Sequence, residues 1–316
     1  MPSKNITILF LGAGKRNSLL QYFDKAAAEL DVDLKKFSYE INTQQPICLE
    51  AEILVGKEWS DKTVLDDVLS KSMLHKVDFL VANVDQASRL LSEHKKIAPE
   101  LFSFSSDEEV VSLLLNKMTF QKCCETHQLG IIPSFDDKSF PIHVKPVHGA
   151  ASQGTRVILS QAELQQFNTT FNHKNFVYQQ YVNGDEYTVD CYKSPVDGAI
   201  YSSVRKRISV QGGEVTETRT VNFPELADRI VEITKHINIV GPFNVQFMVD
   251  QASGAILLME INPRFGGGVV CSIAAGLNIP KLMLQDYLGI QKSTPEIQFG
   301  LVMKRYAKEV FFENSN

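Results

Sequence analysis

The residues best suited to chemistry lie in the stretch MEINPRFGGG near the end of the sequence. Glu260 and Asn262 are two positions apart, so on a strand their side chains point to one face. In an antiparallel hairpin with NVQFMVD, a three-residue loop centred on Ser253 would place Gln246 opposite Glu260. All three side chains offer oxygen, the ligand atom that Mg²⁺ prefers. We predict a magnesium site from Gln246, Glu260 and Asn262; the alternative is a solvated polar face.

Arginines and glycines accompany these oxygen donors. Arg264 directly follows the predicted ligands, and its guanidinium suits a phosphate or acylphosphate. The three glycines after it let a ligand approach the backbone closely. In VRKRISV, Arg205 and Arg207 lie on one face of a predicted strand and suit an anionic substrate. The alternative for these two arginines is an exposed cationic face.

A second phosphate-binding candidate is HVKPVHGAASQGTRV. Lys145 lies on a predicted strand, before a loop of small residues that includes Gly149, Ser152 and Gly154. Unhindered backbone N–H groups in such a loop can bind phosphates. The glycine spacing is that of a P-loop, but Thr155 stands where the P-loop lysine belongs and no helix follows. We predict a β-hairpin flap over phosphates; the alternative is a mobile hairpin without a ligand.

The GAGKRN segment near the start has two glycines after a predicted strand. Asn17 stands where a dinucleotide fingerprint has its third glycine. A structural turn is therefore favoured over NAD binding.

Hydrophobic periodicity predicts the elements that position these residues. Residues 5–100 alternate between strands and helices, which predicts a small doubly wound α/β domain. From about residue 140 short strands separated by turn residues predominate, with a helix in PELADRIVEITKHINI and a last strand in LVMKRYAKEV. The predicted fold class is therefore α/β plus α+β.

Bulk composition narrows the function. The 316 residues carry a formal net charge of −5, which argues against a nucleic-acid-binding surface. The five cysteines show no zinc spacing, and we expect reduced thiols in a cytoplasmic protein. ITILFLGAG is too short to span a bilayer, so we expect no membrane association.

Taken in order, these motifs resemble those of the ATP-grasp enzymes, and among them the carbamoyl phosphate synthase large subunit. The matching segments run from LGAGKRNSLL through NKMTF, QQYVNGDEYTVD and NVQFMVD to MEINPRFGGG. The resemblance implies a preATP-grasp, Rossmann-like domain over residues 1–103 and an ATP-grasp domain over residues 104–316. Within the second domain, two α+β subdomains would clamp ATP, and the lid subdomain would cover about residues 136–182.

The resemblance also implies roles for individual residues. Gln246, Glu260 and Asn262 fall at magnesium ligands, with Mn²⁺ as an alternative ion, and Arg205, Arg207 and Arg264 fall near the transferred phosphate. The implied ATP-binding residues are Lys117, Lys145, Gly149, Ser152, Gly154, Gln179, Gln180, Val182 and Glu186. Asn116, Gln179 and Gln180 depart from the family pattern, in which these positions are commonly acidic.

The implied activity is ADP-forming ligation, in which a carboxylate becomes an acylphosphate and is coupled to an amine or another nucleophile. The alternatives are a carbamoyl-phosphate-synthase-like subunit acting on bicarbonate and a non-catalytic ATP-binding regulatory subunit. Because the sequence holds one ATP-grasp unit, we expect it not to be a complete carbamoyl phosphate synthase. The implied partners are small molecules, and the family suggests a homodimer. The substrates themselves are not readable from the sequence.

Overall fold

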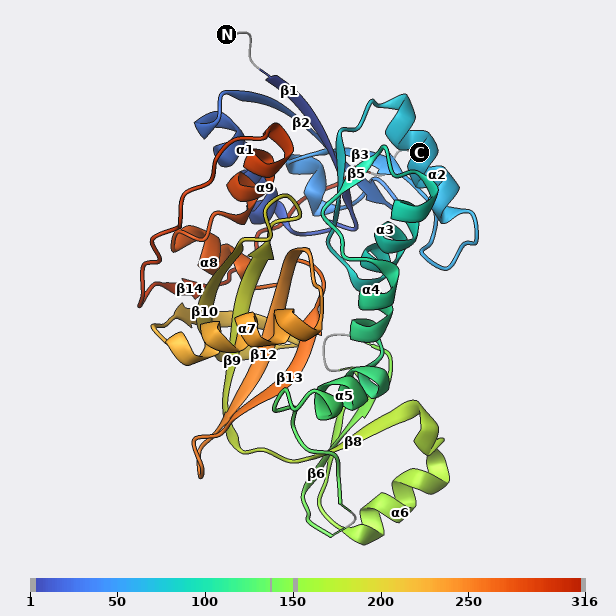
Figure 1. Ribbon diagram of the computed structural model, residues 1–316. Helices are drawn as coiled ribbons and strands as arrows, with labels where there is room; N and C mark the ends of the chain where they lie inside the picture. The colour runs from blue at the N-terminus through green and yellow to red at the C-terminus, as the bar shows by residue number, and fades with distance from the viewer. Residues whose placement is uncertain (1–3, 137, 150–152, 314–316) are drawn as a thin grey trace.

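The computed structural model describes residues 4–136, 138–149 and 153–313, and it begins with a parallel sheet (Figure 1). The strand order β3-β2-β1-β4-β5 confirms the predicted doubly wound α/β arrangement. The strands are β1 (Lys4–Leu11), β2 (Val32–Glu40), β3 (Glu52–Val55), β4 (Phe79–Ala82) and β5 (Phe102–Ser103). Between them lie α1 (Asn17–Glu29), the short helix η1 (Pro46–Leu49), α2 (Val64–Leu74) and α3 (Asp85–Ile97).

Two helices lead from this sheet to the rest of the chain: α4 (Glu108–Leu115) and α5 (Lys117–Thr126). Asn116 caps α5, because its side chain accepts hydrogen bonds from the backbone N–H groups of Met118 and Thr119. Asn116 thus separates α4 from α5, and α5 ends at Thr126.

A six-stranded antiparallel sheet forms the centre of the molecule, in the order β13-β12-β9-β10-β11-β14. Helix α7 (Pro224–His236) covers one face with Leu226, Ile230 and Ile233, which form a core with the apolar side chains of the sheet. The strands are β9 (Gly184–Lys193), β10 (Ile200–Gln211), β11 (Glu214–Thr220), β12 (Gly241–Asp250), β13 (Ile256–Asn262) and β14 (Val302–Lys304).

The predicted last strand, LVMKRYAKEV, was too long, because only Val302–Lys304 is a strand. Helices α8 (Val269–Ala274) and α9 (Ile279–Leu288) pack against α1 and join the central part to the leading sheet. No helix among the described residues has the length and apolar character needed to cross a membrane.

A three-stranded sheet, β7-β6-β8, lies at the far end of the molecule from β1–β3 (Figure 1). It consists of β6 (Ile142–Pro146), β7 (Arg156–Ile158) and β8 (Phe176–Gln180), with α6 (Gln161–Thr170) and the short helix η2 (His173–Asn175) between β7 and β8. Helix α6 was not predicted from the sequence. It buries Leu164 and Phe167 in a small core of this unit, which we call the lid unit (residues 142–180).

Candidate functional site

The β12–β13 hairpin brings the three predicted metal ligands together. Gln246 pairs with Glu260, and Asn244 pairs with Asn262. The register predicted for Gln246 and Glu260 is confirmed. The four side chains share the sheet face opposite α7, because Val245 and Ile261 between them point into the core.

The reason given for this register was wrong. Asp250 donates a backbone hydrogen bond to Ala255, so the hairpin loop has four residues rather than three. A β-bulge at Met259 then restores the pairing, since Phe247 pairs with Leu258 while Gln246 pairs with Glu260. The bulge also lets Leu258 lie in the core while Glu260 faces the site. A regular strand would place both side chains on one face.

Neighbouring strands extend this polar face. On β9, Glu186, Thr188 and Asp190 pair with Met248, Gln246 and Asn244 of β12. On β10, Arg205 pairs with Thr188. The side chains of Thr188, Ser203 and Arg205 each bury one polar atom that has no hydrogen-bond partner among the described residues. Buried polar atoms without partners are uncommon in folded proteins, which favours a ligand on this face. Thr188 and Asp190 were missed, although alternation from Glu186 would have found them.

The predicted arginines each meet a carboxylate. Arg205 is buried and donates to Asp190 at 2.7 Å, and Ser272 donates to the same carboxylate oxygen at 2.7 Å. Arg207 lies 3.0 Å from Glu186. Burial raises the pKa of Glu186, and Arg207 partly offsets that effect. A paired, desolvated guanidinium holds a fixed position, which suits it to bind an anion that arrives.

The lid unit places Lys145 above this face. Burial lowers the pKa of Lys145, Glu260 and Glu186 raise it, and Lys117 lowers it further, so each of these three groups lies within electrostatic range of Lys145. Lys117 donates to the backbone oxygen of Gly149 at 2.8 Å. The structure therefore brings the two predicted phosphate lysines together with the predicted metal carboxylate.

The predicted flap begins at Gly149 and ends at Gly154. Both glycines have positive φ, 137° and 72°, and lie between β6 and β7. Ser152, the third predicted flap residue, lies outside the described residues. No helix follows the turn, because β7 begins at Arg156. The antiparallel pairing of β6 with β7 confirms the predicted β-hairpin, and its role as a flap over phosphates stays a prediction.

A cavity of about 160 Å³ lies beside the predicted adenine hinge, and Gln180, Tyr181 and Val182 line it. This volume is smaller than the roughly 300 to 1,000 Å³ of a pocket for a whole drug-sized ligand, so it suits one ring system. Among the described residues, none accepts a hydrogen bond from the Val182 N–H. The other lining residues, none of which was predicted from the sequence, are Ile132, His143, Asn183, Gly184, Met248 and Met259.

Gln179 lies next to this cavity and is buried. Its Nε2 donates to Gln121 at 2.8 Å, while its Oε1 has no partner among the described residues. Burial, with a smaller contribution from Lys145, lowers the pKa of His143 to about 4, so His143 is neutral at pH 7. Alternation along β6 from Lys145 would have found His143.

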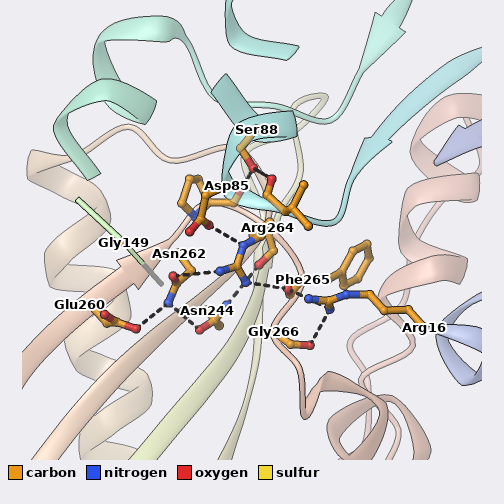
Figure 2. Close-up of polar contacts among 12 residues, drawn as sticks. Arg16, Asp85, Ser88, Gly149, Asn244, Glu260, Asn262, Arg264, Phe265 and Gly266 are labelled. Carbon is orange, nitrogen blue, oxygen red and sulfur yellow. Dashed lines mark hydrogen bonds and ion pairs between the residues drawn. The ribbon is translucent and has the colours of Figure 1, made fainter. Parts of the chain in front are cut away.

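Arg264 connects the site to the leading sheet (Figure 2). Its Nε donates to Asp85 at the start of α3 at 2.5 Å, and its Nη2 donates to Asn262 at 3.4 Å. Ser88 of α3 donates to the backbone oxygen of Pro263 at 3.1 Å. The sequence analysis did not find Asp85, because its partner is 179 positions away.

The side chains of Gln246, Glu260 and Asn262 fit a magnesium site, provided that the Asn262 amide changes its orientation. Glu260 supplies one carboxylate, and Gln246 and Asn262 supply amide oxygens, so phosphates would complete the coordination. No group of three or more His, Cys, Asp or Glu side chains suited to a metal occurs in the described part of the chain. The Asn262 amide turns its Nδ2 to Glu260 at 3.1 Å and to Asn244 at 3.2 Å. Coordination through Asn262 therefore requires its amide to rotate.

The glycines after Arg264 have a packing role that the sequence analysis did not predict. A Cβ on Gly268 would lie 2.6 Å from the Val215 side chain and 2.7 Å from Arg205. A Cβ on Gly266 would lie 3.2 Å from Asn244, whereas one on Gly267 would meet nothing closer than 3.6 Å. None of the three has a positive φ. At Gly266 and Gly268 the space is needed by neighbouring protein atoms.

Comparison with known proteins agrees with this geometry. Residues 172–309 match the family model described as ATP-grasp in the biosynthetic pathway with Ter operon. A carbamoyl phosphate synthase large chain from Campylobacter jejuni is 20% identical over 300 residues, which cover 82% of this chain and 27% of that protein. This chain therefore spans only about a quarter of the length of that relative.

Solved structures with the same fold include an N5-carboxyaminoimidazole synthetase from Staphylococcus aureus complexed with ADP. Its TM-score is 0.74 at 16% identity, covering 93% of this chain and 80% of that one. An L-amino acid ligase from Bacillus licheniformis has a TM-score of 0.70 at 17% identity, covering 94% and 76%. Residues 172–309 are thus similar to an ATP-grasp family, and the chain shares the fold of these solved structures.

Proposed function

We propose that this protein is a Mg²⁺-dependent, ADP-forming ligase that activates a carboxylate as an acylphosphate and couples it to an amine or another nucleophile. The observation that carries the proposal is the polar face of β9, β10, β12 and β13 lying opposite Lys145 of the lid unit. Cations for phosphates and oxygen ligands for a metal meet there. Phosphoryl transfer needs positioning and charge stabilisation more than a nucleophilic side chain.

The charge of each side chain decides its role in the proposed site. Lys145 and Lys117 bind ATP phosphates, and Gly149, whose backbone oxygen accepts a hydrogen bond from Lys117, lies beside them. Gln246, Glu260 and Asn262 hold Mg²⁺, which neutralises charge on the phosphates when bound. The base lies in the cavity beside the hinge and donates to the free oxygen of Gln179.

The reaction has two displacements. A substrate carboxylate oxygen attacks the γ-phosphorus of ATP, the bond to the β,γ-bridging oxygen breaks, and ADP leaves. The nucleophile then attacks the acyl carbon, and the carbon–oxygen bond to phosphate breaks. Arg205, Arg207 and Arg264 stabilise the negative charge on the transferred group in both steps. The lid unit excludes water from the acylphosphate.

The test measures ADP and phosphate release from ATP with Mg²⁺ or Mn²⁺, across pooled carboxylates and amines. Wild-type release requires one pool of each kind. Glu260→Ala abolishes this release and weakens nucleotide binding in Mg²⁺, because the site's one predicted carboxylate ligand is gone. Glu58→Ala removes an exposed carboxylate in the leading part and serves as the matched control. Unchanged turnover in Glu260→Ala at ordinary Mg²⁺ would show that the metal assignment is wrong.

The similarity to carbamoyl phosphate synthase supports a second candidate, in which bicarbonate is the carboxylate. Release of ADP with bicarbonate and ammonia alone would identify this reaction. Tight ATP binding without release from any pool would instead support a regulatory, nucleotide-binding subunit.

A further inference from the structure

The turn after β1 is not used by the proposed reaction, yet it faces the site. Its backbone is held from within, because the Gly14 N–H donates to Glu40 at the end of β2 at 2.8 Å, and Ser38 donates to the same oxygen at 2.6 Å. Glu40 is therefore engaged by the turn itself, which agrees with the structural turn favoured over NAD binding. The turn ends in Arg16, whose guanidinium reaches the glycine segment after β13 (Figure 2).

The position of this turn in the parallel sheet is significant. Strands β1 and β4 are neighbours, and the order β3-β2-β1-β4-β5 reverses direction between them. Open α/β sheets bind ligands outside the carboxyl ends of the strands at such a switch point. Arg16 follows β1 there, while Asp85 and Ser88 follow β4. The segment from Pro263 to Gly267 lies against the same place, since Ser88 and Arg16 both donate to its backbone oxygens.

Three guanidinium groups surround this segment, and they come from three distant parts of the chain. Arg16 donates to the backbone oxygens of Phe265 at 3.3 Å and Gly266 at 3.2 Å. Arg264 donates to Phe265 at 3.2 Å, and Arg305 donates to Gly267 at 2.6 Å. Together they form what we call the arginine cluster (Arg16, Arg264 and Arg305).

The charges in the arginine cluster are unbalanced. Arg264 pairs with Asp85 and Arg305 pairs with Glu214, but Arg16 forms no ion pair with any residue that the structure describes. Burial and the repulsion of Arg264 lower the pKa of Arg16 to about 10, so it stays charged at neutral pH. An oxyanion beside Arg16 would relieve this repulsion and supply the missing partner.

The arginine cluster is also connected to the reaction centre. Asn262 links Glu260 to Arg264 through contacts of 3.1 and 3.4 Å. Arg264 and Arg16 then share the backbone oxygen of Phe265. A small molecule with an acidic group on Arg16 could therefore extend its other end toward the phosphates at Glu260.

We propose that Arg16, assisted by Arg305, binds an acidic group of the nucleophilic substrate, which is thus an amine that carries a carboxylate or a phosphate. This inference rests on the proposed function and specifies its acceptor. The competing role for Arg16 is purely structural, as a clamp that joins the leading sheet to the central part through backbone oxygens. Binding measurements with matched ligands separate these roles.

The experiment titrates the full chain, saturated with Mg²⁺ and ADP, with amines in matched pairs and measures binding by calorimetry. Each of the twenty amino acids is paired with its decarboxylated amine or, for proline, with pyrrolidine, and phosphoethanolamine is paired with ethanolamine. The two arms distinguish a carboxylate from a phosphate. In at least one pair, the amine that carries the acidic group should bind about tenfold or more tightly than the amine that lacks it. This difference in affinity is the size expected for one charge-assisted hydrogen bond.

Two variants complete the test. Arg16→Gln keeps an amide donor for the backbone oxygens but removes the charge, and it should lose the preference for the acidic member without losing Mg²⁺–ADP binding. Arg219→Gln removes an exposed arginine on β11 and should change neither. No preference in wild type, or a preference that survives in Arg16→Gln, would overturn the inference. Failure of the proposed function would give a different result from failure of this inference, namely Mg²⁺–ADP binding that does not depend on Glu260.

Discussion

At the scale of single residues, the burial of Lys145 should make nucleotide binding depend on pH. Burial lowers its pKa, so the free protein loses the lysine proton at a lower pH than an exposed lysine does. Phosphates bind the protonated form, so nucleotide binding draws a proton from solution at alkaline pH. Affinity for Mg²⁺–ADP should therefore fall as pH rises through the free-protein pKa of Lys145.

Calorimetric titration from pH 7 to 10, in buffers of different ionisation enthalpy, measures this proton uptake. Lys145→Met should weaken binding by roughly 10- to 150-fold, the range for a hydrogen bond to a charged group, and should remove the pH dependence. Lys174→Met, at an exposed position of the lid unit, is the matched control. A pH dependence that persists unchanged in Lys145→Met would assign it to another group.

Residue types and local spacing predicted much of the candidate site. The shared face of Glu260 and Asn262 was recoverable, because side chains alternate along a strand. The pairing of Gln246 with Glu260 was predicted with the wrong loop length, and it depends on the bulge at Met259. Asp85 and Arg16 were not recoverable, since each meets its partners across more than 170 positions. Sequence spacing carries no information about contacts that only the packing of two domains creates.

At the scale of elements, the glycine segment between β13 and α8 offers a sharp test of packing. Gly268→Ala places a Cβ against Val215 and the buried guanidinium of Arg205. We expect a loss of about 1 to 3 kcal/mol in the free energy of unfolding, because the Arg205 guanidinium cannot move without disturbing the Arg205–Asp190 pair. Turnover should fall as well, since Arg205 is displaced from the reacting groups.

Gly267→Ala is the control for this prediction, because its Cβ would meet only ordinary contacts. Denaturant unfolding and ATP turnover are measured for both variants. Equal behaviour of the two would mean that Gly268 is not held tightly against Arg205.

The β12–β13 hairpin shows why the exact course of a strand is harder to predict from the sequence than the face on which its side chains lie. The alternation of Glu260 and Asn262 was correct locally, but the sequence did not reveal that Met259 is a bulge residue. A bulge satisfies two demands at once, namely Leu258 in the core and Glu260 in the site, and both arise from tertiary packing. Helix α6 was not predicted for a similar reason. Its buried side chains pack against the strands of the lid unit, and the local sequence does not show that packing.

At the scale of the whole molecule, one of the hydrophobic cores is shared by the leading sheet and the central part. Phe10 and Phe79 of the leading sheet belong to the same cluster of buried side chains as Val269 and Met283 of α8 and α9. The lid unit has a separate, smaller core. We therefore expect the leading and central parts to unfold together, while the lid unit opens at lower free energy.

Phe265 tests this expectation, because it lies in the shared core and meets Phe23 of α1 edge to face at 6.2 Å. Phe265→Ala should cost about 3 to 5 kcal/mol and reduce the hydrogen-exchange protection of β1, β4 and β12 by similar factors. Phe167→Ala, in the lid core, should reduce protection only in β6, β8 and α6. Loss of protection in β1 without loss in β12 would show that the two parts are energetically independent. In that case the interface between the leading and central parts, where Arg16 and Arg264 meet, could open. The bound nucleophilic substrate would then have to hold this interface closed.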